Sequence, residues 1–135
     1  METDLDAGFF QALGLRVCEA TGKKVVLEWD VTPAHHQPYG IVHGGVHCSA
    51  VESAASVGAA LWLGEDGKVV GVSNHTDFLR PVADGTLRAT ATPIHCGRTQ
   101  QLWLVEVTDE RERLIARGEV RLQNLPASAL ERKGP

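Results

Sequence analysis

The stretch HGGVHCSAVESAASVGAALWL, residues 43–63, decides the fold of this 135-residue chain. Its alanines and leucines favour a helix, and no proline interrupts it. Small residues lie on nearly every side of that helix. A helix wrapped closely by a curved sheet requires such residues, because bulky side chains would hold the two backbones apart. We therefore expect one central helix over residues 44–63, packed against a sheet.

Strand-like runs separated by turn residues predict the rest of the fold. The predicted strands cover residues 15–20, 24–31, 68–78, 86–96, 100–107 and 114–123. Asp4 could cap a short helix over residues 4–13, and residues 126–135 are expected to fray. One long helix with about six mostly consecutive strands predicts a single α+β domain over residues 1–135, in which an antiparallel sheet carries the helix on one face.

Composition limits the partners of the chain. A net charge of −4, with no basic stripe between aromatic residues, argues against nucleic acid. The start, Met1-Glu2-Thr3-Asp4, lacks the basic region of a signal peptide, which favours the cytosol. Residues 46–63 are too rich in serine for a membrane span, and Glu52 lies near their centre, where a charge would be costly in a bilayer. Three widely spaced cysteines suit reduced thiols better than a disulfide framework.

The chemical signal lies in Gly44, Gly45 and Glu52. Two glycines at a helix N-terminus can bring bare backbone N–H groups close to a ligand, where the helix dipole favours developing negative charge. A glutamate in the middle of an apolar helix is costly to bury unless it is paired or kept for chemistry. A polarising helix terminus together with such a carboxylate suggests hydrolysis by acyl transfer.

The spacing of these groups predicts an oligomer. Gly44 and Glu52 are eight residues apart, which is about 12 Å along a helix axis. They cannot both touch one reacting carbonyl. If both serve one reaction, a second, antiparallel copy of the helix must supply the glutamate. A two-fold homodimer provides that arrangement. We therefore predict an active site shared between two chains.

The segment HHQPYGIVHGG, residues 35–45, followed nine residues after His43 by Glu52, resembles a known family. It is similar to the hotdog-fold acyl-CoA thioesterases of the phenylacetic-acid-degradation and 4-hydroxybenzoyl-CoA type, which include the enterobactin-pathway proofreading thioesterase. The likeness covers roughly residues 33–123 and includes Val69-Val70-Gly71, Arg80-Pro81-Val82, Gly85 and Gly97-Arg98. It implies a hotdog fold, an obligate homodimer that pairs into a dimer of dimers, and no cofactor except coenzyme A within the substrate.

The resemblance also implies residue roles. Glu52 would be the catalytic carboxylate, acting as general base or as nucleophile. The backbone N–H of Gly44 would polarise the thioester carbonyl, and Gln37 and His43 would position the thioester or the attacking water. Ser56, on the same helical face as Glu52, would assist the water. Glu52 of one chain would face Gln37 and Gly44 of the partner subunit.

Candidates for substrate binding are aromatic residues and arginines. Trp62, Phe78 and Trp103 could form an apolar acyl pocket, although some relatives have histidine at the position of Phe78. Arg80 and Arg98 could bind the nucleotide phosphates, although arginines in turns are more often only solvated.

Two other kinds of site, a zinc site and a cysteine nucleophile, are disfavoured. His43 and His47 are four residues apart, with His35 and His36 upstream, but the glutamate that follows the first histidine in helical zinc motifs is absent. Cys48 could act as a nucleophile, but a packed thiol is favoured because no acid partner is evident. No metal is therefore predicted, and the missing Gly-x-Ser-x-Gly elbow disfavours a serine esterase.

The predicted function is metal-independent hydrolysis of an acyl-CoA or acyl-carrier-protein thioester, with an apolar or aromatic acyl group. Two alternatives stay open. One is a hotdog dimer that binds an acyl-CoA or a metabolite without turnover, and the other is a hotdog dehydratase.

Overall fold

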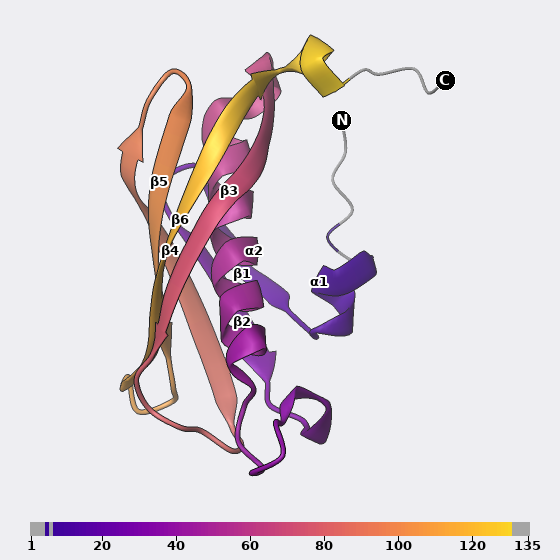
Figure 1. Cartoon of the computed structure of the whole chain (residues 1–135), viewed down its shortest axis with the longest axis vertical. Helices are drawn as coiled ribbons and strands as arrows, with labels where there is room; N and C mark the ends of the chain where they lie inside the picture. The colour runs from indigo at the N-terminus through magenta and orange to yellow at the C-terminus, as the bar shows by residue number, and fades with distance from the viewer. Residues whose placement is uncertain (1–4, 6, 131–135) are drawn as a thin grey trace.

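The architecture is a curved antiparallel sheet that packs one face against a long helix (Figure 1). The computed structural model describes residues 5 and 7–130. The six strands lie in the order β1-β2-β4-β5-β6-β3. The elements are α1 Gly8–Ala12, β1 Arg16–Ala20, β2 Val25–Asp30, η1 Pro33–His35, α2 Gly44–Leu63, η2 Gly64–Asp66, β3 Gly67–Phe78, β4 Thr86–Cys96, β5 Gln100–Thr108, β6 Leu114–Pro126 and η3 Ala127–Leu130. The predicted α+β fold is confirmed.

Small residues on α2 let the sheet approach the helix backbone closely. Ala50, Ala54 and Ala59 are fully buried against the sheet. At Gly58 a Cβ atom would lie 2.5 Å from the ring of Trp103, so only glycine leaves room for this indole. The core therefore combines a thin helix with large side chains from the strands, as the composition of the helix predicted.

Strand β3 occupies an edge of the sheet. It follows α2 in the chain but pairs antiparallel with β6, so it crosses to the far side of the sheet from β1 and β2. Val72 in this strand is 52% exposed, and Val70 is also exposed. A long edge strand with exposed apolar side chains is a template for pairing with another strand.

Both chain ends differ from the prediction. Helix α1 begins at Gly8, with Ala7 at its N-cap position, so it is shorter than predicted. The proposed cap, Asp4, lies outside the described residues. At the other end β6 continues to Pro126 and a 3-10 turn covers Ala127–Leu130, because pairing with β3 reaches Pro126. The structure therefore places residues 127–130, where fraying was expected, in a 3-10 turn, and residues 131–135 lie outside the described part.

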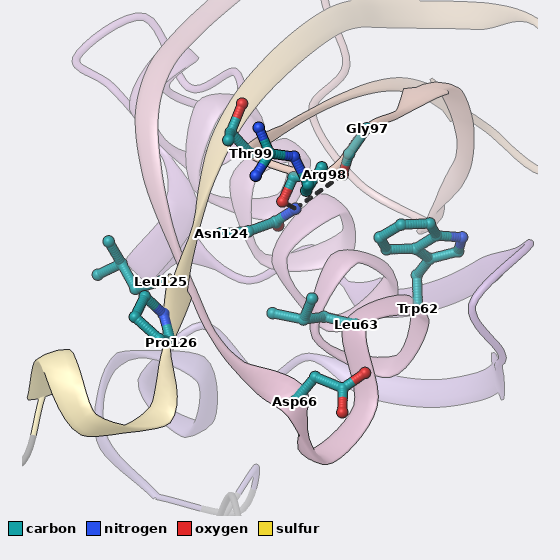
Figure 2. A pocket seen from close by; sticks show the side chains of 9 residues that line it. All are labelled: Trp62, Leu63, Asp66, Gly97, Arg98, Thr99, Asn124, Leu125 and Pro126. Atoms are coloured by element: carbon teal, nitrogen blue, oxygen red, sulfur yellow. Dashed lines mark hydrogen bonds between the residues drawn. The ribbon is translucent and has the colours of Figure 1, made fainter.

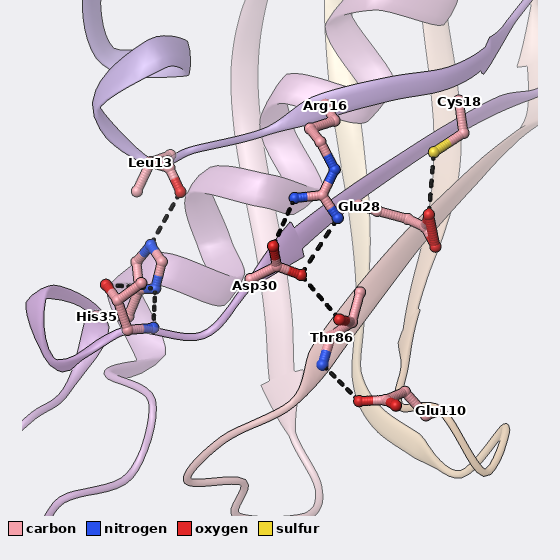
Figure 3. Close-up of polar contacts among 9 residues, drawn as sticks. Leu13, Arg16, Cys18, Glu28, Asp30, His35, Thr86 and Glu110 are labelled. Atoms are coloured by element: carbon pink, nitrogen blue, oxygen red, sulfur yellow. Dashed lines mark hydrogen bonds and ion pairs between the residues drawn. The ribbon is translucent and has the colours of Figure 1, made fainter.

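Side-chain pairs join β1, β2 and β4 on the outer face of the sheet (Figure 3). Arg16 donates to both carboxylate oxygens of Asp30, at 3.0 and 3.3 Å, and Thr86 Oγ1 donates to Asp30 Oδ1 at 2.8 Å. The hydrogen bond from Arg16 lowers the pKa of Asp30. Cys18 Sγ donates to Glu28 Oε1 at 3.2 Å, and the pKa of this thiol is raised by desolvation and by the hydrogen bond to that carboxylate. These side chains therefore hydrogen-bond to one another and join neighbouring strands of the sheet.

Candidate active site

The N-terminus of α2 leaves one backbone donor free. His43 occupies the N-cap position, and its Nδ1 accepts the N–H of Gly45 at 2.7 Å. The carbonyl of His43 accepts the N–H of Val46 at 2.9 Å. Among the described residues, the N–H of Gly44 has no hydrogen-bond partner. The positive end of the helix dipole therefore offers this N–H to a ligand.

His43 thus has a structural function that the sequence left open. Because Nδ1 accepts a hydrogen bond, the proton of the neutral ring is on Nε2. The side chain is exposed, so Nε2–H can still donate to a substrate or a water molecule. The cap and the predicted positioning role are compatible.

A cavity of about 280 Å³ adjoins the free donor. Three segments form it: the loop before α2, the first turn of α2, and the chain that leaves β3. The lining residues are Gln37, Ile41, Val42, Gly44, His47, Phe78, Leu79, Arg80 and Pro81. Four residues predicted for the site, namely Gln37, Gly44, Phe78 and Arg80, therefore meet in one cavity.

The loop holds Gln37 in a fixed orientation. Its backbone N–H donates to the carbonyl of Ile41 at 2.8 Å, and its carbonyl accepts the N–H of Gly40 at 2.9 Å. Gly40 has a φ of +79°, a left-handed conformation that favours glycine. The side-chain Oε1 of Gln37 accepts the N–H of Tyr39. The amide nitrogen of Gln37, which carries two donors, is therefore the end left for a ligand.

Phe78 packs directly over Gly44. A Cβ atom at Gly44 would lie 2.5 Å from Cε2 of Phe78. Only glycine at position 44 therefore allows the ring to approach the backbone this closely. The ring of Phe78 also lies 6.1 Å from the ring of His47, measured between centroids. Phe78 is 57% exposed, so it forms a wall of the cavity that faces solvent.

Glu52 is exposed in the single chain. Its Cδ lies 3.9 Å from the position of a Cβ on Gly71, so the carboxylate lies beside the edge strand β3. The expectation that the apolar helix buries this carboxylate is wrong for one chain, because the sheet ends at β3 and leaves this side of α2 open. Glu52 does not line the cavity at Gly44. Ser56, one turn further along α2, is half-buried.

The structure separates the predicted substrate residues into two groups. Trp62 and Arg98 lie at the C-terminal end of α2, around a second cavity of about 660 Å³ (Figure 2). There the side-chain amide of Asn124 donates to the carbonyls of Gly97 and Arg98, at 3.0 and 3.2 Å, and holds the turn between β4 and β5. The residues that line this second cavity are Trp62, Leu63, Asp66, Gly97, Arg98, Thr99, Asn124, Leu125 and Pro126.

The assignment of Trp103 to the acyl pocket is wrong. This side chain is fully buried beneath α2, and its Nε1 donates to Gln101 Oε1 at 2.8 Å. Its position follows from Gly58, whose missing side chain makes room for the indole. Trp103 therefore belongs to the core.

The histidines before α2 are bound to backbone groups. His35 Nδ1 accepts the N–H of Thr32 at 3.0 Å, so its Nε2–H donates to the carbonyl of Leu13 at 2.9 Å (Figure 3). His36 Nε2 donates to the carbonyl of Ala83 at 2.7 Å. Within the described part of the chain, no three His, Cys, Asp or Glu side chains gather as a metal site.

Two residues near the site were not assigned a role from the sequence. His47 lines the cavity, and the sequence marked it only by its four-residue spacing from His43, which was considered for zinc and not for a substrate. Asn74 of β3 donates its side-chain amide to the carbonyl of Cys48 at 3.0 Å. In an α-helix that carbonyl also accepts the N–H of Glu52. Asn74 therefore connects the turn that carries Glu52 to the edge strand, and no local pattern marks this long-range contact.

Comparison with known families matches residues 39–116 to the Thioesterase superfamily. Rv1847 of Mycobacterium tuberculosis H37Rv is 50% identical over 122 residues, which are 88% of this chain and 87% of that protein. A 1,4-dihydroxy-2-naphthoyl-CoA hydrolase of Listeria monocytogenes is 36% identical, covering 80% of this chain and 88% of the other. The crystal structure of AziG from S. sahachiroi is 52% identical with a TM-score of 0.86, covering 89% of this chain and 98% of that one.

The chain belongs to the thioesterase superfamily. The predicted resemblance and the hotdog fold are thereby confirmed, and the hydrolase class follows from the family. In the described residues no helix has the length and apolar character needed to cross a bilayer.

Proposed function

We propose that this protein hydrolyses an acyl thioester of coenzyme A or of an acyl carrier protein to a free acid and a thiol. The observation that carries the proposal is the unpartnered N–H of Gly44, which adjoins a cavity that also contains Gln37. The apolar lining at Phe78 and Leu79 suits an apolar or aromatic acyl group.

The helix terminus would stabilise the transition state. The thioester oxygen would accept the N–H of Gly44, with the amide of Gln37 as a second donor. As water adds to the carbonyl carbon, negative charge develops on that oxygen, and one such donor commonly contributes several kcal/mol. The C–S bond then breaks, and the thiol leaves with a proton. This route uses no metal.

A second copy of the chain would supply the carboxylate. In a two-fold dimer the exposed edge of β3 would pair with the same strand of the partner, which would place two α2 helices antiparallel. Glu52 of the partner subunit would then approach Gly44. It would either remove a proton from the attacking water, or attack the carbonyl carbon itself, in which case the thiol leaves and water hydrolyses the resulting mixed anhydride to the free acid and the carboxylate. The exposed position of Glu52 beside β3 supports this arrangement.

In the same dimer, the cavity around Trp62 and Arg98 of the partner subunit would receive the far end of the substrate. If Glu52 of the partner subunit lies level with Gly44, the partner's Trp62 lies about 15 Å further along the axis, beyond the helix terminus. The long pantetheine arm of the substrate could span this distance. The partner's Arg98 and the chain's own Arg80 would then bind phosphates, and neither forms an ion pair among the described residues.

Thiol release from a panel of acyl-CoAs tests the activity. Glu52→Gln keeps the size of the side chain but removes its charge and should abolish nearly all turnover. Glu65→Gln is a matched control, because Glu65 is exposed in the 3-10 turn after α2 and should leave the rate unchanged. Full activity of Glu52→Gln would refute the mechanism. Tight binding of an acyl-CoA without thiol release would favour the non-catalytic alternative.

Subunit mixing tests the shared site. Gln37→Ala and Glu52→Gln variants should each be nearly inactive. After random exchange, half the dimers are mixed, and each mixed dimer has one intact site and one doubly damaged site. Activity should then recover to about a quarter of wild type. If exchange is demonstrated by mass spectrometry and no activity returns, the two residues do not meet across the interface.

A further inference from the structure

His47 is a buried polar side chain that the proposed reaction does not use. It is 4% exposed, and its Nδ1 is sealed from solvent without a hydrogen-bond partner among the described residues. Such an atom is costly to bury, and native structures rarely keep one without a reason. A purely apolar side chain would fill this core position at a lower cost.

The ring of His47 is placed to contact a ligand. It lines the cavity that contains Gly44 and Gln37. Its centroid lies 6.4 Å from that of Trp29, in an edge-on arrangement, and 6.1 Å from that of Phe78. Two aromatic neighbours thus hold the imidazole at the wall of this cavity.

The imidazole is neutral and has one donor to offer. Burial lowers the pKa of His47 to about 4, so the ring carries no charge near pH 7. A neutral imidazole has one N–H and one lone pair. An orphaned buried N–H is rarer than an unused acceptor, so we assign the lone pair to Nδ1 and the proton to Nε2. Nε2–H is then the group left for a ligand.

We propose that His47 is a specificity-determining residue: it donates Nε2–H to an oxygen substituent carried by the acyl group of the substrate. The inference rests on the proposed thioester hydrolysis and adds a polar requirement to an otherwise apolar pocket. His47 lies three residues after Gly44, which is about 4.5 Å along the axis. The preferred oxygen is therefore attached close to the thioester carbon, as at the ortho or meta position of a benzoyl group.

Pairs of isosteric substrates test this proposal. Methoxybenzoyl-CoA and ethylbenzoyl-CoA have nearly the same shape, but only the first offers an oxygen acceptor. In the wild type, the ratio of their kcat/KM values should favour the methoxy compound at one ring position. In His47→Leu that ratio should fall about tenfold or more, because the donor is gone. His47→Gln, which retains a donor, should preserve part of the preference.

Other outcomes overturn the proposal. Equal losses for both members of each pair in His47→Leu would mean that the histidine acts on the thioester itself or only supports the core. If His47→Leu does not fold, NMR of the wild type decides: the ring ¹⁵N signals of His47 should move with methoxybenzoic acid and not with ethylbenzoic acid. If the preference for the methoxy compound persists in His47→Leu while Glu52→Gln abolishes turnover, this inference alone is refuted. If no acyl-CoA is hydrolysed, the proposed function fails, while the NMR comparison still tests His47.

Discussion

Adding a methyl group at Gly44 and at Gly58 should have opposite consequences, although both would meet an aromatic ring at the same distance. A Cβ at Gly44 would lie 2.5 Å from Phe78, and one at Gly58 would lie 2.5 Å from Trp103. Ordinary contact begins near 3.4 Å, so each ring must move by about 1 Å. The exposure of the ring decides whether it can: Phe78 is 57% exposed, and Trp103 is fully buried.

Gly58→Ala should destabilise the fold and leave the site intact. Overpacking in a dense core costs about 1–3 kcal/mol, and displacing Trp103 also strains its hydrogen bond to Gln101. Alanine recovers up to about 1 kcal/mol of helix propensity, so the net loss should be about 1–2 kcal/mol. For a domain of this size, the melting temperature should then fall by roughly 3–8 °C. Once folded, this variant should keep nearly wild-type kcat/KM.

Gly44→Ala should do the reverse. Phe78 can swing toward solvent, so the melting temperature should change by no more than about 3 °C. The displaced ring, however, alters the cavity where the thioester would sit, and an error of about 1 Å there can cost up to about 100-fold. We expect kcat/KM to fall at least about tenfold, with activity partly restored by adding Phe78→Ala.

Thermal unfolding at one protein concentration, together with thiol-release kinetics, measures both effects. The reasoning is refuted if Gly44→Ala melts lower than Gly58→Ala, or if Gly44→Ala is fully active while its fold is intact. It is also refuted if Phe78→Ala fails to restore any activity to Gly44→Ala, because the ring is then not the obstacle.

Three further predictions concern histidines and metal. His43→Ala removes the cap on Gly45 and should cost about 1 kcal/mol of stability by urea unfolding, whereas His75→Ala at an exposed site should cost less than about 0.5 kcal/mol. Folding lowers the pKa of His47 from 6.5 to about 4, so the unfolded chain binds a proton at a higher pH than the folded chain does. The contribution of the neutral ring to the free energy of unfolding is therefore fully present above pH 6.5, and this free energy should fall by up to about 3 kcal/mol as the pH drops to 4. Urea unfolding of His47→Leu should lack that part of the pH dependence, and an unchanged slope would contradict the buried neutral ring. Dialysis against EDTA should leave thiol release unchanged, whereas a loss reversed by zinc would support a metal site.

Most of the fold could be predicted because its signals are local. The small residues of 44–63 predicted the helix, and the strand boundaries were correct to within a few residues. The length of the N-terminal helix was overestimated, because a candidate cap at Asp4 does not show whether tertiary contacts extend the helix that far. The length of β6 was underestimated, because its last residues pair with β3, a strand about fifty residues earlier in the chain.

The candidate site was less predictable than the fold. Gln37, Gly44 and His43 lie within one short segment, so their proximity followed from the motif itself. The aromatic residues did not follow in the same way. Phe78 reaches Gly44, Trp103 fills the space left by Gly58, and Trp62 lies at the far end of the helix. Each of these positions depends on how a strand or a helix end is packed, which composition does not reveal.

The sequence by itself determined the central helix and its glycine start, because helix propensity and glycine geometry act between near neighbours in the chain. The axial rise between Gly44 and Glu52 also predicted that a shared site would take its carboxylate from a second chain, and that prediction is still to be tested by subunit mixing. Only the tertiary structure decided that Glu52 is exposed beside an edge strand, that Arg80 and Arg98 belong to different cavities, and that His47 is buried with an unpartnered nitrogen. These outcomes depend on strand order and on which helical face the sheet covers. Both arise from packing between distant segments.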